Sequence, residues 1–238
     1  MTQFFDEGSG CNSRLAFLIA TAVALTSAMV MSVNADDTWD GETDALWTTA
    51  SNWVGGTVPG SADTATFSSG SPSNTTIDLG AGVTIQGIVF AAGPEITLGT
   101  GAVNSQTLTR STGGNFFANS TVDHLINAQV ILGEPGDASG TFRFQNQGTT
   151  NLLTIAGDIL NNGNTQTLSK QGPGTLVLSG DNTYGNTIIE NGTLRLGSAT
   201  ALGTGNTITI QSVNSASGIT ADTTLDLAGN SINVGSLV

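Results

Sequence analysis

The chain offers few groups for acid–base or nucleophilic chemistry. His124 is the sole histidine among 238 residues, and Asp123 directly precedes it. A Ser-His-Asp relay needs a histidine that is oriented by one partner and hydrogen-bonded to another, so the fold would have to bring a serine to His124. One histidine beside one aspartate in sequence meets none of these geometric conditions. We therefore interpret His124 as structural and expect no catalytic residue.

Carboxylates are the other candidates, because cleavage of a polysaccharide needs convergent acids, or calcium-binding acids with a base nearby. The possible acids and bases are dispersed over different segments of the chain: Asp78, Asp158, Asp181 and Asp226, with Arg110, Arg143, Lys170 and Arg195. We expect no catalytic cluster among them. Arg195 stands between two leucines, an outward position that suits solvent contact or an ion pair with a neighbouring coil.

Acids and tryptophans gather between residues 36 and 67. The stretch Asp36 to Asp44 is acidic, but at EF-hand spacing Thr38 fills a ligand position and Trp47 stands where a bidentate glutamate belongs, so we predict no metal site. All three tryptophans of the chain, Trp39, Trp47 and Trp53, lie in this block. They would either cover one end of a core or form a platform for sugar stacking. Burial is the commoner fate of tryptophan, and we favour a cap.

The composition favours short strands and tight turns. Charged residues make up 10%, hydrophobic residues 38%, and 32 residues are glycine. The formal net charge of −13 would repel phosphate backbones, which argues against a nucleic-acid partner and leaves glycans and other proteins open. The glycines between residues 101 and 114 follow no nucleotide-binding pattern, so we expect no cofactor.

The first 35 residues have the pattern of an export signal. An apolar run follows Arg14 and ends at Val33-Asn34-Ala35, a small-residue cleavage motif. An uncleaved anchor is the alternative, since the run approaches membrane-spanning length, but threonines and serines interrupt it and no basic cluster follows. We predict a helical signal peptide at 1–35, cleaved after Ala35, and a secreted or surface location. The only cysteine, Cys11, would be removed with the signal peptide, so the mature chain would have no disulfide and no thiol ligand or nucleophile.

From about residue 74 onward, apolar and polar residues alternate in short segments, which indicates half-buried strands. Glycines and asparagines between them supply the positive φ of sharp turns. In the C-terminal part the segments start at 176, 194, 208 and 225, steps of 18, 14 and 17 residues. A β-sandwich would also give short strands, but Gly/Asn-rich turns and outward Thr, Ser and Asn favour a solenoid. We predict an all-β fold, a right-handed parallel β-helix.

A 30-residue stretch carries a recognisable repeat. Its elements are a lysine, a Gly-x-Gly-Thr-Leu strand, a Ser-Gly-x-Asn-Thr-Tyr turn, a Thr-containing strand and a Gly-Thr-Leu-x-Leu-Gly strand: Lys170, Gly172 to Leu178, Ser179 to Tyr184, Thr187 to Glu190, and Gly192 to Gly197. Residues 168–197 thus resemble the autotransporter-associated β-strand repeat. Asn186 replaces the second glycine of the family's Gly-Gly-Thr step, and asparagine tolerates the same turn.

The resemblance implies a β-helical passenger region, secretion, and a C-terminal translocator or sorting signal. The sequence holds neither of the latter, and residues 225–238 resemble a further repeat cut short, so any outer-membrane association would depend on a missing C-terminal region. Residues 36–67 are similar to the segment that opens such repeat regions.

The sequence predicts four parts: a signal peptide (1–35), a Trp-rich N-terminal cap (36–67), irregular β-helix coils (68–165) and a truncated repeat region (166–238). We expect a non-enzymatic protein of the bacterial surface with a structural or adhesive role, whose partners are cell-surface glycans or other surface proteins. The alternatives are a polysaccharide-active enzyme of the pectin-lyase-like kind and a glycan-binding module built on the tryptophans.

Overall fold

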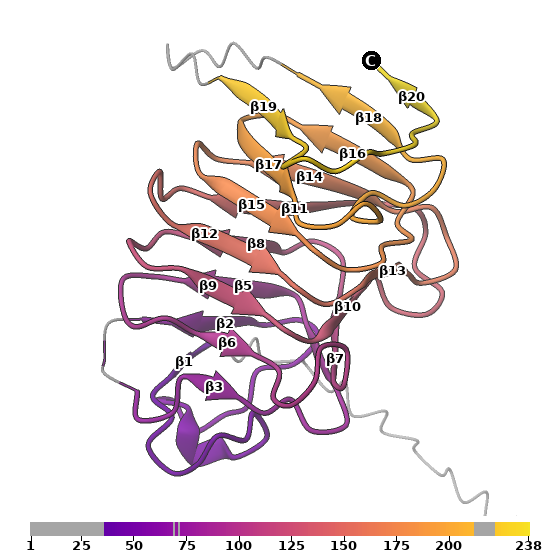
Figure 1. The fold of residues 1–238 in the computed structure, drawn as a ribbon. Helices are drawn as coiled ribbons and strands as arrows, with labels where there is room; N and C mark the ends of the chain where they lie inside the picture. Colours follow the sequence, from indigo (N-terminus) through magenta and orange to yellow (C-terminus); the bar gives the residue numbers. More distant parts are fainter. Residues whose placement is uncertain (1–35, 69, 71, 212–221) are drawn as a thin grey trace, which may run out of the picture. The chain divides into compact units, whose positions relative to one another are not determined.

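The computed structural model describes residues 36–68, 70, 72–211 and 222–238, and the predicted signal peptide lies outside the described residues. The described residues fold into twenty short strands, β1 to β20, and one turn of 3₁₀ helix, η1 (Ala50–Asn52). The strands stack into a nine-stranded, a seven-stranded and a four-stranded sheet (Figure 1).

The nine-stranded sheet contains, in spatial order, β1 (Asp37–Trp39), β2 (Thr64–Phe67), β5 (Gly87–Phe90), β8 (Asn115–Ala118), β11 (Thr141–Asn146), β14 (Thr167–Gln171), β16 (Asn186–Ile189), β18 (Thr207–Ile210) and β20 (Ser236–Leu237). The seven-stranded sheet contains β3 (Thr76–Ile77), β6 (Thr97–Leu98), β9 (His124–Ile126), β12 (Leu152–Ile155), β15 (Thr175–Leu178), β17 (Gly192–Leu196) and β19 (Thr223–Asp226). The four-stranded sheet contains β4 (Val83–Ile85), β7 (Thr107–Arg110), β10 (Gln129–Leu132) and β13 (Ile159–Asn161).

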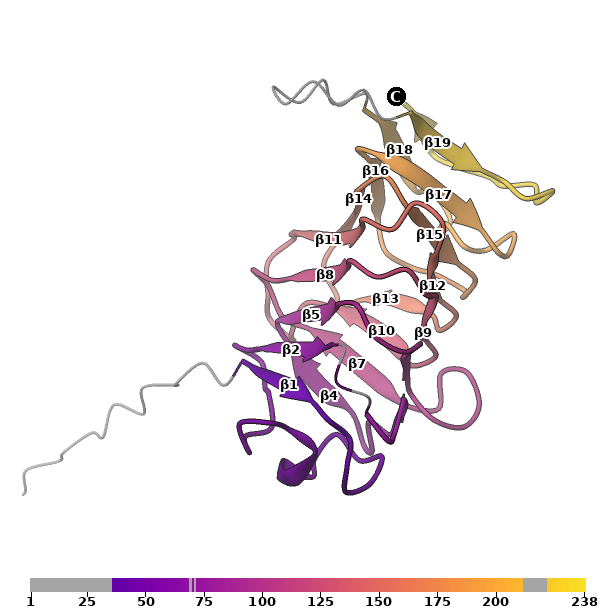
Figure 2. The same ribbon diagram turned by 90° about the vertical axis from the view of Figure 1, so that its left-hand side faces the viewer.

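Neighbouring strands in these sheets all run parallel. The chain visits the three sheets in turn: β5, β6 and β7 make one coil, and β8, β9 and β10, all labelled in Figure 2, make the next. A sandwich of antiparallel hairpins is therefore wrong for this chain. The all-β parallel β-helix expected from the sequence is confirmed.

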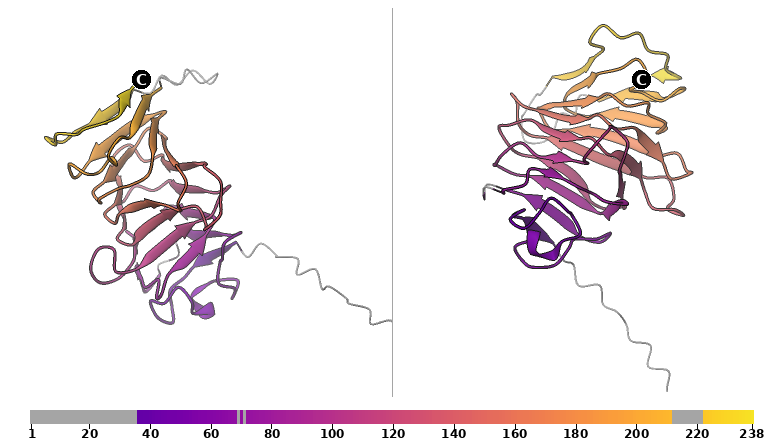
Figure 3. Two further views of the ribbon diagram at one scale, coloured as in Figure 1. Left: turned by 90° about the vertical axis from the view of Figure 1, so that its right-hand side faces the viewer. Right: turned by 60° about the horizontal axis from the view of Figure 1, so that its bottom comes forward.

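The coils change shape halfway along the solenoid (Figure 3). Phe116 pairs with Phe144 one coil later, a repeat of 28 residues, as between Ile96 and His124. The four-stranded sheet ends at β13, and from β14 onward each coil contributes strands to two sheets only. Leu168 pairs with Thr187, so the coil there has shortened to 19 residues, the separation that also joins Asn182 to Ala201.

The alternation read from the sequence sets which side chains fill the interior. In β11, Phe142 and Phe144 are buried while Arg143 between them is exposed. Phe144 lies in register with Phe116 on one side and Lys170 on the other, so each inward position belongs to a column that runs through the coils. The 18-residue step between positions 176 and 194 is one coil, since Leu176 pairs with Leu194.

Buried amides join the turns of successive coils. Oδ1 of Asn182 accepts a hydrogen bond from the N–H of Ile159 at 2.6 Å, and its Nδ2 donates to the carbonyl of Ala201 at 2.6 Å. One side chain thereby joins three coils. Asn146 similarly donates to the carbonyls of Asn151 and Thr175. Because a buried polar atom without a partner costs about 1–3 kcal/mol, these amides fix where each turn lies.

Candidate functional site

The fold brings a serine to the sole histidine, a contact that the sequence did not reveal. Oγ of Ser120 lies 2.6 Å from Nε2 of His124, and both residues are buried. The N–H of Ile96, one coil earlier, donates to Nδ1 at 3.2 Å. The imidazole stacks on the ring of Phe90, with 4.5 Å between ring centres. Ser120 precedes β9 through an irregular turn, so its four-residue spacing from His124 carried no geometric signal.

These hydrogen bonds fix the imidazole proton and argue against a catalytic relay. Nδ1 accepts the N–H of Ile96, so the proton of the neutral ring is on Nε2 and is donated to Ser120. A general base would have to accept the serine proton at that same nitrogen. Oδ1 of Asp123 accepts the N–H of Leu152 at 2.8 Å and does not orient the ring. The arrangement suits a structural histidine.

Acid should destabilise the protein through His124. Burial lowers the pKa of His124 to about 4 from 6.5, against the opposing charge of Asp123. Between these values the unfolded chain binds a proton and the folded chain does not. The contribution of His124 to stability is therefore fully present above pH 6.5 and falls by about 3 kcal/mol as the pH drops towards 4. Urea denaturation of wild type and His124→Gln across this window should show a flatter pH dependence in the variant.

Ser120→Ala is the matched control for this measurement, because it alters the same pair without removing the titrating ring. It should retain the wild-type pH dependence. If His124→Gln and wild type lost stability equally between pH 6.5 and 4, another group would be responsible.

Two of the dispersed aspartates are neighbours in space. Oδ1 of Asp158 accepts the N–H of Asp181 at 2.8 Å, which places these residues in adjacent coils. The hydroxyl of Thr200 donates to Oδ1 of Asp181, and Asp78 accepts the N–H of Gly80 at 2.8 Å. These carboxylates close turns. Across the described parts of the chain, no three His, Cys, Asp or Glu side chains group so that they could hold a metal ion.

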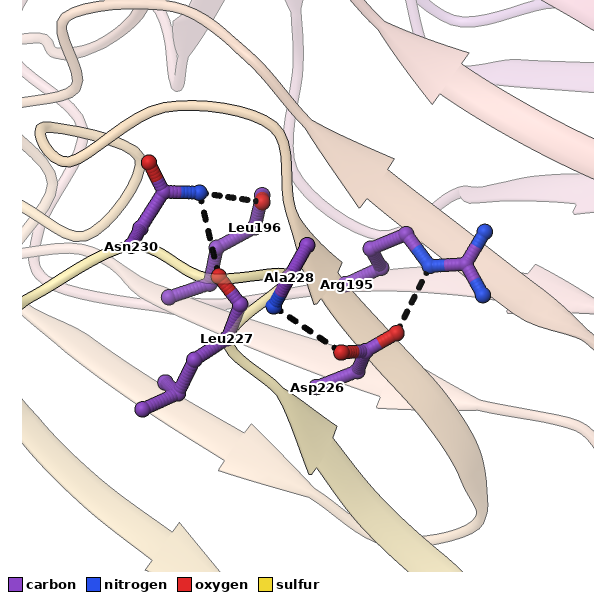
Figure 4. A network of polar contacts seen from close by, with 6 residues as sticks. All are labelled: Arg195, Leu196, Asp226, Leu227, Ala228 and Asn230. Carbon is purple, nitrogen blue, oxygen red and sulfur yellow. Dashed lines mark hydrogen bonds and ion pairs between the residues drawn. The ribbon is translucent and has the colours of Figure 1, made fainter.

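Asp226 forms an ion pair with Arg195, its register partner on the adjacent strand (Figure 4). The distance from Nε of Arg195 to Oδ2 of Asp226 is 2.8 Å, and the N–H of Ala228 donates to Oδ1 at 2.9 Å. The hydrogen bond from Arg195 lowers the pKa of the Asp226 carboxyl below its ordinary value. Asn230 closes the following turn by donating to the carbonyl of Leu227. Of the two roles expected for Arg195, the ion pair with a neighbouring coil is the one found.

The three tryptophan rings pack against one another within the N-terminal coil. Trp39, Trp47 and Trp53 are at most 2% exposed. The ring centre of Trp53 lies 5.1 Å from that of Trp39 and 4.9 Å from that of Trp47, both in edge-to-face contact. Each indole N–H donates to a backbone carbonyl. No ring face is open to a sugar, so the tryptophan-based glycan module is not supported.

The acids near the tryptophans hold loops in place. Both oxygens of Asp37 accept the N–H of Gly55, at 2.8 and 2.9 Å. Asp44 accepts the N–H of Leu46 at 2.8 Å and Nδ2 of Asn52 at 2.7 Å. The bond from Leu46, more than any other interaction, lowers the pKa of Asp44.

Two of the expected bases are enclosed by the solenoid. The guanidinium of Arg110 lies 5.0–5.4 Å from the ring centres of Phe116, Phe142 and Phe144, and its Nη2 donates to the carbonyl of Gly114. Burial, with a smaller contribution from the charge of Arg143, lowers the pKa of Arg110 to about 9. Lys170 is also fully buried. Neither cation can reach a substrate on the surface.

A column of neutral polar side chains runs along the outside of the nine-stranded sheet. The column residues pair in register on consecutive strands: Thr141, Thr167, Asn186, Thr207 and Ser236. Strands are about 4.8 Å apart, so the column repeats a hydroxyl or amide at that interval. Its first three residues border an open hollow of about 250 Å³, completed by Ser139, Gly140 and Thr165. No charged side chain lines the hollow.

These observations define a parallel β-helix in which most of the candidate acids and bases are buried, paired or hydrogen-bonded within turns, while Arg143 is exposed on β11. Residues 168–196 match the family profile of the passenger-associated-transport-repeat. This confirms the resemblance found in the sequence, and the matched residues run from β14 to the end of β17. By its description the family is a repeat associated with the transport of passenger domains, which implies an exported or surface-located protein. No curated protein and no solved structure shows significant similarity to the chain.

Within residues 36–68, 70, 72–211 and 222–238, helical structure is limited to the single turn η1. None of the helical structure there is long and apolar enough to cross a bilayer.

Proposed function

We propose that this chain is the non-enzymatic passenger region of an exported bacterial surface protein, with a structural or adhesive role. In this proposal residues 1–35 are a signal peptide cleaved after Ala35. The repeat match at 168–196 supports a passenger-type β-helix. The observation that carries the adhesive role is the in-register polar column from Thr141 to Ser236 on the nine-stranded sheet.

The column suits a repetitive partner. Each hydroxyl or amide offers one weak hydrogen bond, and many such bonds on a rigid array combine into strong attachment because later contacts form at high effective concentration. The partner is a cell-surface glycan or another surface protein. A neutral or cationic partner is favoured over a polyanion, since the chain carries a formal net charge of −13.

Removing column hydroxyls without disturbing the strands tests this role. The triple variant Thr141→Val, Thr167→Val and Thr207→Val keeps β-branched side chains of the same shape. We expect binding of the immobilised protein to a glycan array or to intact cells to fall at least about tenfold, because multivalent attachment multiplies small losses. Thermal unfolding monitored by circular dichroism would verify that the fold is retained.

The seven-stranded sheet supplies the matched control. Thr175, Thr193 and Thr224 also form an outward column, so the three corresponding Thr→Val changes alter the same chemistry elsewhere. The control should bind as wild type does. Equal binding by both triple variants would reject the column as the contact surface, and release of sugar fragments from a pectin-like polymer would instead support the enzymatic alternative.

A further inference from the structure

Lys170 occupies a position that a lysine rarely takes. It is 0% exposed on β14 and lies in register between Phe144 and Ile189, two buried residues of the neighbouring strands. Lysine is almost never fully buried without a partner for its charge. Within the described residues the ion pair formed is that of Arg195 with Asp226, so no carboxylate neutralises this ammonium. The charge must be stabilised in another way.

Three backbone carbonyls surround the ammonium. Nζ of Lys170 donates to the carbonyl oxygens of Gln171 at 2.9 Å, Gly172 at 2.7 Å and Asn191 at 2.9 Å. An ammonium group has three N–H donors, and here each has one acceptor. Gln171 is the last residue of β14 and Gly172 begins the turn that follows, whereas Asn191 lies in the turn that follows β16, 21 residues from Lys170.

We propose that these three carbonyls form a monovalent-cation cage between two successive coils, and that the chain fills the cage with its own ammonium group. Converging carbonyl oxygens without a carboxylate suit a single positive charge, as in pores that replace the hydration shell of K⁺ by backbone carbonyls. Gly172 has a φ of +76°, a conformation that turns its carbonyl into the cage and that other residues rarely adopt.

The cage couples the folding of one coil to that of the next. With only the β14 coil in place, the ammonium would have two of its three acceptors, and Asn191 completes the set when the following coil packs on it. Burial lowers the pKa of Lys170 to about 7, and hydrogen bonds from Nζ to the three carbonyls favour its charged form. The residues matched by the repeat family, 168–196, contain both the ammonium and all three carbonyls.

Chemical rescue of the full chain tests the cage. Lys170→Ala removes the ammonium and its stem, so that the three carbonyls lose the donors that Nζ supplied. We expect Tm to fall by roughly 10 °C, in line with the usual shift of a few degrees per kcal/mol for a chain of this size. Ammonium or methylammonium chloride should restore part of the loss. Tetramethylammonium chloride at the same concentration has the charge but no N–H donor, and should restore none.

Lys170→Met is the second variant, because it keeps an apolar stem and fills the space. Its Tm should lie below that of wild type and should not respond to ammonium, since the methionine blocks the cage. A Lys170→Met protein as stable as wild type would overturn the proposal, whether or not Lys170→Ala folds. Equal responses of Lys170→Ala to ammonium and to tetramethylammonium would also overturn it, because they would reveal a general salt effect.

Discussion

Trp53→Ala should lower the free energy of unfolding by about 3–5 kcal/mol, the usual cost of emptying a buried tryptophan position. The ring of Trp53 is 2% exposed and lies between those of Trp39 and Trp47, so its removal leaves a cavity and two edge-to-face contacts unmade. Its N–H also donates to the carbonyl of Trp47 at 2.9 Å, which would lose its partner. Urea denaturation followed by circular dichroism measures the loss.

Two controls separate these contributions. Trp53→Phe keeps an aromatic ring but removes the N–H donor, and should cost clearly less than the alanine variant. Val54→Ala changes the adjacent side chain, which is 70% exposed, and should have almost no effect. A loss below about 1 kcal/mol for Trp53→Ala would mean that the N-terminal coil is loosely packed.

Gly172→Ala should be the second severe substitution, because it combines backbone strain with a steric conflict. Gly172 has a φ of +76°, and a Cβ built on it would overlap the carbonyl oxygen of Asn146 in the preceding coil. Left-handed backbone alone costs an alanine roughly 1–2 kcal/mol. The overlap adds to this cost, since the backbone of a stacked coil cannot move aside without disturbing its own hydrogen bonds. We expect a total loss of at least about 3 kcal/mol by urea denaturation.

Gly205→Ala is the control, and the difference between its loss and that of Gly172→Ala gives the steric part. Gly205 has the same φ of +76°, but a Cβ there would meet nothing within 4 Å. It should therefore show only the conformational cost. If the two glycine variants proved equally stable, close stacking of the coils would not be what requires glycine at position 172.

The strands were predictable because their signal is local. In the Phe142-Arg143-Phe144 segment, successive side chains point to opposite faces, so the two rings lie inside and the charge lies outside. This holds for any sheet that the strand could join. The change from three-sided to two-sided coils was not predictable, because β13 is only three residues long, Ile159–Asn161, and its two last side chains are only partly buried. The number of sides follows from the number of residues in a coil, and this number can be counted only once the strand register is known.

The contacts around candidate site residues depended on register too. Asp158 and Asp181 looked unrelated in sequence, and only the stacking of adjacent coils brings them together. The sequence placed Lys170 among the possible bases. Lys170 stands two residues after Leu168 in β14, so both side chains lie on the same inward face of the strand. The local pattern carries this signal, although lysine is rarely buried in proteins.

Because the coils change shape along the solenoid, its two ends should differ in their resistance to a pulling force. Coils from β14 onward contribute strands to two sheets instead of three, so each is joined to its neighbour by fewer strand pairings than the wider coils before it. In a stack where each unit touches only its neighbours, the weakest interface yields first. Under a pulling force applied to the ends of the chain, the C-terminal two-sided coils would therefore unfold first, one at a time. The three-sided coils next to the N-terminal tryptophans would stay folded at that force.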